Sequence, residues 1–430
     1  MKKVNTICFC TIIFFAYCLL SIGQLYSQAP QDSNFQAEGR NITIENNVGI
    51  NTTTPESKLH IKGSENTTQL IIDGGTGQSN NNPLFKLRDN NGNDLLWLHS
   101  DLATNIFMGV GAGSAGGGGN ANTFVGGQSG SLNTSGNNNT GLGYATLNVN
   151  TSGSENTATG VGALNYNSTG NYNTATGSSA LYYNTTGSHN TANGYNALIH
   201  YTGGHLNTAI GEGSLLLNAI GQENSAFGFH SLQSNISGSW NSAFGNYALT
   251  SCTGILNSAI GYNAGANITS GTENIALGFN SNVPNADGSF QIRMGNSAIT
   301  YAGIQVAWTI TSDRRWKSDI QESNLGLDFI SRLKPVSYYR TNDESKKREY
   351  GFIAQDLEEA LNASGATDNG IISKDDYGWY GVRYNDLMTP MVKAIQELSD
   401  QNKTQQQLID QQNQVIENLL SRIDALEKKQ

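Results

Sequence analysis

Ser312 and Lys317 are the residues whose types and spacing best suit covalent chemistry in this 430-residue chain. The region after Thr311 contains no histidine and no cysteine, so neither a Ser-His-Asp triad nor a Cys-His pair can form within it. A serine nucleophile there would need a lysine as its general base. A lysine in that role must be desolvated until it titrates at roughly 7 to 8. Trp316 and Ile320 could supply the apolar wall for it.

The separation of five residues is awkward for this pair. On a helix the two side chains would lie about 140° apart, and on a strand they would point to opposite faces. Ser312 and Lys317 can therefore meet only across a turn or between chains. The alternative is that Ser312 and Asp313 merely cap a helix. Arg314, Arg315 and Lys317 would then be solvated side chains on that helix.

The patterns downstream predict a small α+β domain over residues 301–398 that would position the pair. From Tyr301 to Gln430 the chain has 16 basic and 20 acidic residues, which is an ordinary globular composition. LGLDFISRLKPVSYY predicts an amphipathic helix that ends before Pro335 and is followed by a strand. YGFIAQDLEEAL predicts a strand running into a helix, and YGVRYNDLMTPMVKAIQEL leads into the final helix.

A heptad repeat over residues 388–430 predicts a C-terminal coiled coil. Its core positions alternate at steps of three and four: Met388, Met391, Ile395, Leu398, Asn402, Gln405, Ile409, Gln412, Ile416, Leu419, Ile423 and Leu426. Isoleucine at a and leucine at d would by themselves favour a dimer. A lone helix packed on the body is disfavoured, because a run of roughly 64 Å is too long for that.

Residues 102–300 carry a repeat of 17 residues that predicts a β-roll or β-helix rod. The unit starts with asparagine, usually followed by alanine two places later and glycine four places later. It begins at Asn105, Asn122, Asn139, Asn156, Asn173, Asn190, Asn207, Asn224, Asn241, Asn257 and Asn274. Such a unit is too short for a helical pair or a propeller blade but suits one coil. About twelve coils would form a rod of roughly 58 Å.

Within each coil, residue types indicate their places. The glycines, and with them the asparagines, are expected at corners that need positive φ, and the asparagines could also stack in hydrogen-bonded ladders. Small residues followed by leucine, as at Ala163 and Ala180, fit a narrow interior.

The rod offers little catalytic chemistry. Glu155, Glu223 and Glu273 each precede a repeat asparagine, so they share one edge and lie roughly 19 and 14 Å apart along the axis. A glycosidase pair needs about 5 to 9.5 Å, which leaves only a pair between chains. Four histidines show no metal-ligand spacing, namely His189, His200, His205 and His230. No metal and no cofactor is predicted.

Residues 1–29 read as a secretory signal. Lys2 and Lys3 precede an apolar run from Ile7 to about Ile22, which is short for a membrane-spanning helix, the alternative interpretation. Three of the four cysteines lie in it, so Cys252 alone would remain in the secreted chain. Residues 30–101 predict an N-terminal β cap, with QLIIDG and LFKLRDNNGNDLLWLHS as strands and an Asn-Gly turn. A formal net charge of −10 argues against a nucleic-acid partner.

Four ordered pieces after the rod resemble the intramolecular chaperone domain of phage endosialidases and tail spikes, also found in myelin regulatory factor. They are Ser312–Lys317, Leu333–Tyr338, Gly351–Gln355 and Tyr384–Leu387. The resemblance implies a domain that trimerises, helps a β-rich fibre to fold and cuts itself off, with Ser312 and Lys317 as catalytic dyad and Thr311–Ser312 as the cleavage site. The repeats resemble the head repeats of trimeric autotransporter adhesins, whose period is shorter.

The sequence as a whole thus predicts a secreted or cell-surface homotrimeric fibre with a self-cleaving chaperone domain. A cell-surface glycan or other host-surface ligand is the expected external partner. The only expected interaction with a membrane is that of the signal peptide. Two alternatives remain open at this point. One is a structural trimeric fibre that never cuts itself, and the other is a glycan-degrading spike.

Overall fold

The computed structural model describes residues 48–50, 54–61, 70, 72, 84–100, 102–116 and 119–428. The predicted signal peptide and much of the predicted cap lie outside these residues. The chain divides into two compact units, residues 1–77 and 78–430. In the first unit, β1 (Val48–Ile50) pairs in parallel with β2 (Leu59–Ile61). Leu70 and Ile72 of the expected QLIIDG strand are exposed and lie outside any strand, so that prediction is wrong at the two described positions.

The second unit begins with the predicted hairpin. β3 (Phe85–Arg88) and β4 (Asp94–His99) are antiparallel, and Asp89 holds the turn by accepting hydrogen bonds from the backbone N–H groups of Asn91 and Asn93. Gly92 has a φ of 83°, which is the left-handed conformation that an Asn-Gly turn requires. β4 pairs with the first strand of the rod, so the hairpin continues the edge of its sheet.

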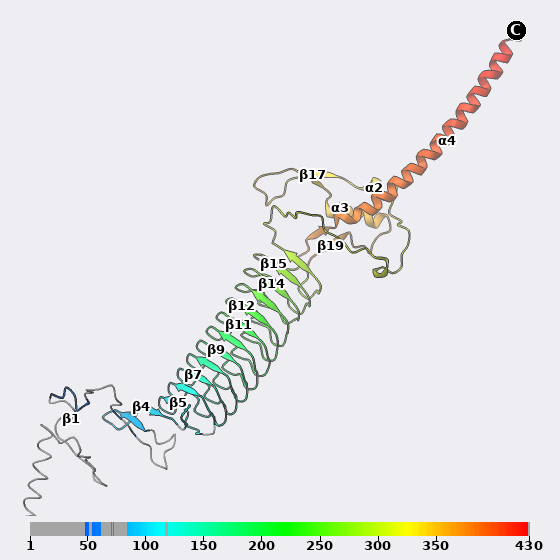
Figure 1. Cartoon of the computed structure of the whole chain (residues 1–430). Helices are drawn as coiled ribbons and strands as arrows, with labels where there is room; N and C mark the ends of the chain where they lie inside the picture. Colours follow the sequence, from blue (N-terminus) through cyan, green and yellow to red (C-terminus); the bar gives the residue numbers. More distant parts are fainter. Residues whose placement is uncertain are drawn as a thin grey trace, which may run out of the picture. The chain divides into compact units, whose positions relative to one another are not determined.

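The rod is a β-solenoid of twelve coils, each with one three-residue strand (Figure 1). The strands pair in parallel, each with its equivalent one repeat later, so Ala192 lies between Ala175 and Ala209. The strands are β5 (Ile106–Met108), β6 (Thr123–Val125), β7 (Thr140–Leu142), β8 (Thr157–Thr159), β9 (Thr174–Thr176), β10 (Thr191–Asn193), β11 (Thr208–Ile210), β12 (Ser225–Phe227), β13 (Ser242–Phe244), β14 (Ser258–Ile260), β15 (Ile275–Leu277) and β16 (Ile292–Met294). The predicted fold class is confirmed.

The repeat asparagines line the interior of the solenoid. Asn173 is fully buried, its backbone N–H donates to Oδ1 of Asn156 at 3.0 Å, and its own Nδ2 donates to the carbonyl of Gly187 at 2.8 Å. Each amide thus satisfies backbone groups that water cannot reach. The predicted ladder is confirmed, whereas the placement of these asparagines at left-handed corners is wrong. In nearly every coil the residue before the repeat asparagine is left-handed instead, such as Glu155 with a φ of 61°, and so are interior leucines such as Leu164 with a φ of 51°.

The two glycines of each repeat have different tasks. Gly194 has a φ of 140° and represents the corner glycine that follows each strand. Gly204 represents the second glycine, whose φ is not positive. A Cβ on Gly204 would stand 2.5 Å from the carbonyl oxygen of Gly221 in the next coil and would also collide with the Tyr201 hydroxyl. This glycine is required by the close approach of neighbouring coils.

We expect Gly204→Ala to destabilise the rod by about 1–3 kcal/mol, the usual cost of overpacking a tight interior. Gly203→Ala is the matched control, because its new Cβ would meet only the end of the Thr186 side chain at 3.2 Å. Thermal unfolding of both variants checks the prediction. Equal midpoints would show that the coils do not approach each other as closely as described.

A second interior ladder runs beside the first. Asn150 donates from Nδ2 to Oδ1 of Asn133 at 2.7 Å and to the carbonyl of Gly153 at 2.9 Å. Successive coils fill this interior position with buried residues, namely Asn133, Asn150, Asn167, Asn184, Tyr201, Asn218, Asn235 and Cys252. Burial raises the pKa of the Cys252 thiol to about 11, so the thiol stays neutral inside the rod.

The C-terminal region is a small α+β domain followed by a long helix, as predicted. Its elements are η1 (Arg314–Trp316), α2 (Leu327–Arg332), β17 (Val336–Tyr338), β18 (Glu349–Gly351), α3 (Ala354–Ala363), β19 (Ile372–Lys374), β20 (Tyr380–Val382), η2 (Tyr384–Leu387) and α4 (Met388–Glu427). β17 pairs with β18 and β19 with β20, both antiparallel. Phe329 of α2, Leu357 and Leu361 of α3 and Leu387 of η2 are buried in its core.

The first turns of α4 pack on this domain and the rest is exposed (Figure 1). Pro390 and Ala394 are buried, and the Glu397 carboxylate accepts the backbone N–H of Leu327 at 2.7 Å, which anchors the start of α2. Residues 401–428 are exposed throughout, including the heptad positions. A helix of 40 residues with this exposed apolar seam is compatible with the predicted coiled coil. Among the described residues, no helix is both long and apolar enough to cross a membrane.

Candidate functional site

Ser312 and Lys317 are brought together by a single tight turn. Lys317 Nζ donates a hydrogen bond to Ser312 Oγ at 2.7 Å. Between them lies η1, a 3-10 helix of three residues, and Lys317 follows it in extended conformation with φ −121° and ψ 135°. Of the two arrangements that the spacing allowed, the contact across a turn within one chain is the one observed. The catalytic role of the pair stays a prediction.

Asp313 fixes this turn. Its carboxylate accepts the backbone N–H of Arg315 at 2.8 Å and binds the Arg315 side chain through Nε at 3.0 Å and Nη2 at 2.7 Å. These hydrogen bonds, with the side chain of Arg315 contributing most, hold the pKa of Asp313 below its usual value. The capping role proposed as the alternative is therefore filled by Asp313, and Ser312 remains available to Lys317.

The expected apolar wall does not exist in the single chain. Trp316 is 82% exposed and Ile320 is 56% exposed, and every residue from 301 to 322 is exposed. The reason is that η1 has no buried residue and belongs to neither buried cluster in the described part of the chain. Removing water from the dyad would therefore require contacts from another molecule.

A lysine ammonium in this position can hold the serine hydroxyl but cannot remove its proton. The observed contact places Lys317 Nζ 2.7 Å from the hydroxyl oxygen, and a general base would have to accept the hydroxyl proton across this distance. Ser312 and Lys317 thus already have the relative positions that the reaction needs. Water still surrounds both side chains and would have to be removed before Lys317 could act as a base. This combination suits a reaction that begins only after the site has been covered.

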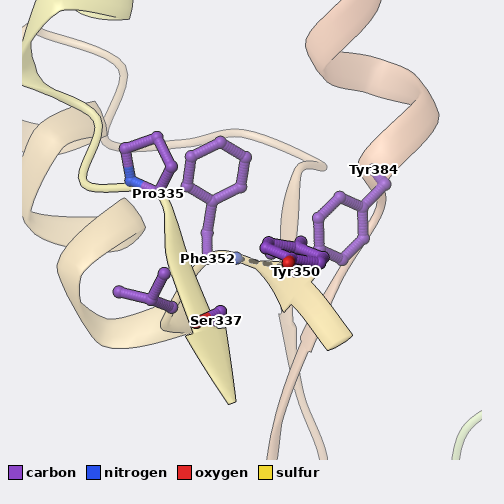
Figure 2. A pocket seen from close by; sticks show the side chains of 7 residues that line it. Pro335, Ser337, Tyr350, Phe352 and Tyr384 are labelled. Carbon is purple, nitrogen blue, oxygen red and sulfur yellow. Dashed lines mark hydrogen bonds between the residues drawn. The ribbon is translucent and has the colours of Figure 1, made fainter. Parts of the chain in front are cut away.

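The other three motif pieces converge on a shallow groove (Figure 2). Pro335 and Ser337 come from β17 and the residue before it, Tyr350 from β18, and Tyr384 from η2. The backbone N–H of Phe352 donates to the Tyr384 hydroxyl at 3.0 Å, which ties the loop after β18 to the entrance of α4.

Gly351 explains part of the motif. A Cβ at this position would collide with the Tyr384 hydroxyl. Motif residues that are far apart in the sequence therefore serve one structural joint between β18 and the long helix. No ionisable pair suited to catalysis lies in this groove among its lining residues, which favours a structural role for it.

The residues weighed in the rod do not form a site. Glu155, Glu223 and Glu273 are exposed at equivalent corners of separate coils. The histidines make ordinary contacts: the ring of His189 stacks on Tyr172 at 4.8 Å, and His205 Nδ1 accepts the backbone N–H of Ser188 at 3.1 Å. Among the described residues, no group of three or more histidine, cysteine, aspartate or glutamate side chains is placed to hold a metal ion.

Residues 312–366 match the model of a peptidase family described as the chaperone of endosialidase. The match begins at Ser312 and includes three of the four motif pieces, whereas Tyr384–Leu387 lies beyond its end. No curated protein and no solved structure is similar enough to the chain to count as a match. The β-solenoid of residues 106–294 precedes the matched segment, so a chaperone-type domain stands directly behind a repetitive fibre body.

Proposed function

We propose that this chain, whose residues 312–366 match the chaperone of endosialidase behind a β-solenoid, forms a secreted homotrimeric surface fibre that cuts itself at Thr311–Ser312. The observation that carries the proposal is the 2.7 Å contact between Lys317 Nζ and Ser312 Oγ, located at the first residue of the family match. The C-terminal domain assists folding of the fibre and is then released with the helix α4.

The reaction is an acyl transfer in two steps. Neutral Lys317 takes the proton from the Ser312 hydroxyl, and Oγ attacks the carbonyl carbon of Thr311. The peptide C–N bond breaks, the proton passes to the departing nitrogen, and an ester joins Thr311 to Ser312 Oγ. Water then hydrolyses the ester, which leaves a carboxylate at Thr311 and restores the serine hydroxyl. No metal, cofactor or further co-reactant is needed for this balance.

Assembly controls the first step. The dyad of a single chain is exposed, and a lysine becomes an effective general base only when water is excluded from it. When copies of the chain come together around α4, the exposed apolar residues beside the dyad become available to exclude water from it. The cut is therefore expected to follow correct assembly, which ensures that only folded fibres lose their folding domain.

The proposal of secretion is based on the signal pattern of residues 1–29. The proposal of an external partner is based on the surface of the rod. The rod carries few charges, and several coils present exposed tyrosines, such as Tyr144, Tyr172 and Tyr195. Flat aromatic faces with hydroxyl groups suit sugar rings, so a cell-surface glycan is the ligand class we propose.

The trimer itself is testable without the cut. We expect the secreted chain carrying Ser312→Ala to have three times the chain mass in solution, because its exposed heptad seam needs partners and the family domain implies three. Light scattering at micromolar concentration measures this. A monomer mass would contradict the proposed assembly, and a dimer mass would show that the Ile and Leu pattern of α4 decides the number of chains.

A further inference from the structure

The segment between the rod and the dyad has the pattern of a β-strand but pairs with no strand in the described part of the chain. In residues 304–310, here called the junction segment, large apolar residues occupy every second position. Ile304, Val306, Trp308 and Ile310 form one face, and Gln305, Ala307 and Thr309 form the other. This period of two, with branched and aromatic side chains, is typical of a strand with one buried face.

In the single chain that face is open to solvent. Ile304 is 53% exposed, Val306 78%, Trp308 70% and Ile310 69%. None of the four belongs to the buried cluster of the rod or to that of the C-terminal domain. Four neighbouring apolar side chains at these exposures are unusual for a surface that stays free.

The backbone of the junction segment is equally unpartnered. Residues 300–311 take part in none of the hydrogen bonds found within the described part of the chain. A segment of high β propensity with free N–H and C=O groups is a template for pairing with another chain. The observations thus point to an intermolecular strand.

We infer that the junction segments of the three copies pair with one another, with Ile304, Val306, Trp308 and Ile310 turned toward the common axis. The occupant is a second copy because the heptad seam of α4 gathers identical chains, which brings identical segments together at the same level. The chain has no charged residue between Arg293 and Asp313, so the copies can approach without repulsion.

This inference deepens the proposed function, because it rests on the homotrimer and names what activates the dyad. The paired segments end at Ile310, two residues before Ser312, and would place the Trp308 and Ile310 side chains of neighbouring copies near it. They would supply the apolar surroundings that Trp316 does not supply in the single chain. The segments would also remain with the rod after the cut, so they would keep the released rods together once α4 has gone.

Cysteine pairing in the uncleaved Ser312→Ala chain tests the inference directly. With Val306→Cys, mild oxidation should link two of the three chains by a disulfide, since thiols on the inner face lie within bonding distance across the axis. Gln305→Cys is the matched control on the outer face and should stay unlinked. The native Cys252 is buried, so it does not interfere.

The outcomes separate the possible failures. A trimer by light scattering in which Val306→Cys stays unlinked, or in which both cysteines link equally, would overturn the inference and leave the trimer standing. A link from Val306→Cys to a second cysteine at Ser337 would place the segment on a neighbour's β17 and would also overturn it. A monomer would overturn both the inference and the proposed assembly.

A charge on the inner face provides a second readout. In the cleavable chain, Val306→Asp should reduce both the yield of the cut and the trimer content of the released rod, whereas Gln305→Asp should change neither. Normal cleavage and a stable released trimer in Val306→Asp would contradict the inference, because a buried aspartate cannot be tolerated on a three-fold apolar axis.

Discussion

A gene that ends at Thr311 is expected to produce an insoluble rod. The coils are so alike that incorrect registers retain most native contacts: β8 and β9 are both Thr-Ala-Thr, and β12 and β13 are both Ser-Ala-Phe. Short strands with open edges also pair with strands of other chains. A C-terminal domain that fixes the chain ends in a common register removes these alternatives, and without it aggregation should dominate.

The control separates folding from stability. A protease site inserted before Ser312 in the Ser312→Ala chain allows the domain to be removed after folding. Rods cut in this way should stay soluble and resistant to further proteolysis, because the ladders and coil contacts are already formed. Solubility is measured by fractionation and resistance by limited proteolysis. Soluble, resistant rods from the truncated gene would show that the domain is not required as a chaperone.

The second large effect concerns the dyad. Ser312→Ala should abolish the release of the fragment Ser312–Gln430, because it removes the hydroxyl that attacks Thr311. Lys317→Ala should nearly abolish it, and Lys317→Arg should not restore it, since a guanidinium remains protonated. Ser318→Ala is the matched control, a neighbouring exposed serine without contact to Lys317 Nζ. A fragment from the Ser312→Ala chain on a denaturing gel would exclude the proposed nucleophile.

The pH dependence of the cut has a definite sign. Cleavage should slow as pH falls below neutral, because only an unprotonated amine accepts the serine proton. The Asp313 carboxylate that caps the turn does not change its protonation state near neutral pH. The hydrogen bonds from Arg315 lower the pKa of Asp313, so its contribution is present above the ordinary carboxyl pKa of 3.8 and is lost only as pH falls further. Faster cleavage at pH 5 than at pH 8 would contradict a lysine base.

The sequence predicts most of the fold because the same residue types recur in nearly every repeat at the positions that are tightly packed. Asparagine and glycine recur where a buried amide satisfies backbone groups or where neighbouring coils approach closely. The second ladder was not predictable, because Tyr201 and Cys252 stand in it beside asparagines and hide its period. The left-handed residues before the repeat asparagines were missed because their side chains are exposed and vary in type, as at Glu155 and Trp240.

The candidate site was predictable in its residues but not in its surroundings. The types of Ser312 and Lys317, and the lack of histidine and cysteine after Thr311, single out the pair. From a spacing of five residues alone, contact between Ser312 and Lys317 within one chain could not be predicted. The three-residue turn η1, held by Asp313, brings the two side chains together. The apolar wall expected from Trp316 and Ile320 is not formed because both side chains are exposed, and we propose that neighbouring copies supply it instead.

Self-cleavage is tested most directly by the intact mass of the purified wild-type protein under denaturing conditions, without added protease. We expect two species, an N-terminal chain that ends at Thr311 and the fragment Ser312–Gln430. Both masses should correspond to hydrolysis of that single peptide bond. A preparation that contains only the full-length secreted chain, although it is trimeric by light scattering, would contradict self-cleavage and favour a structural fibre that keeps its chaperone domain.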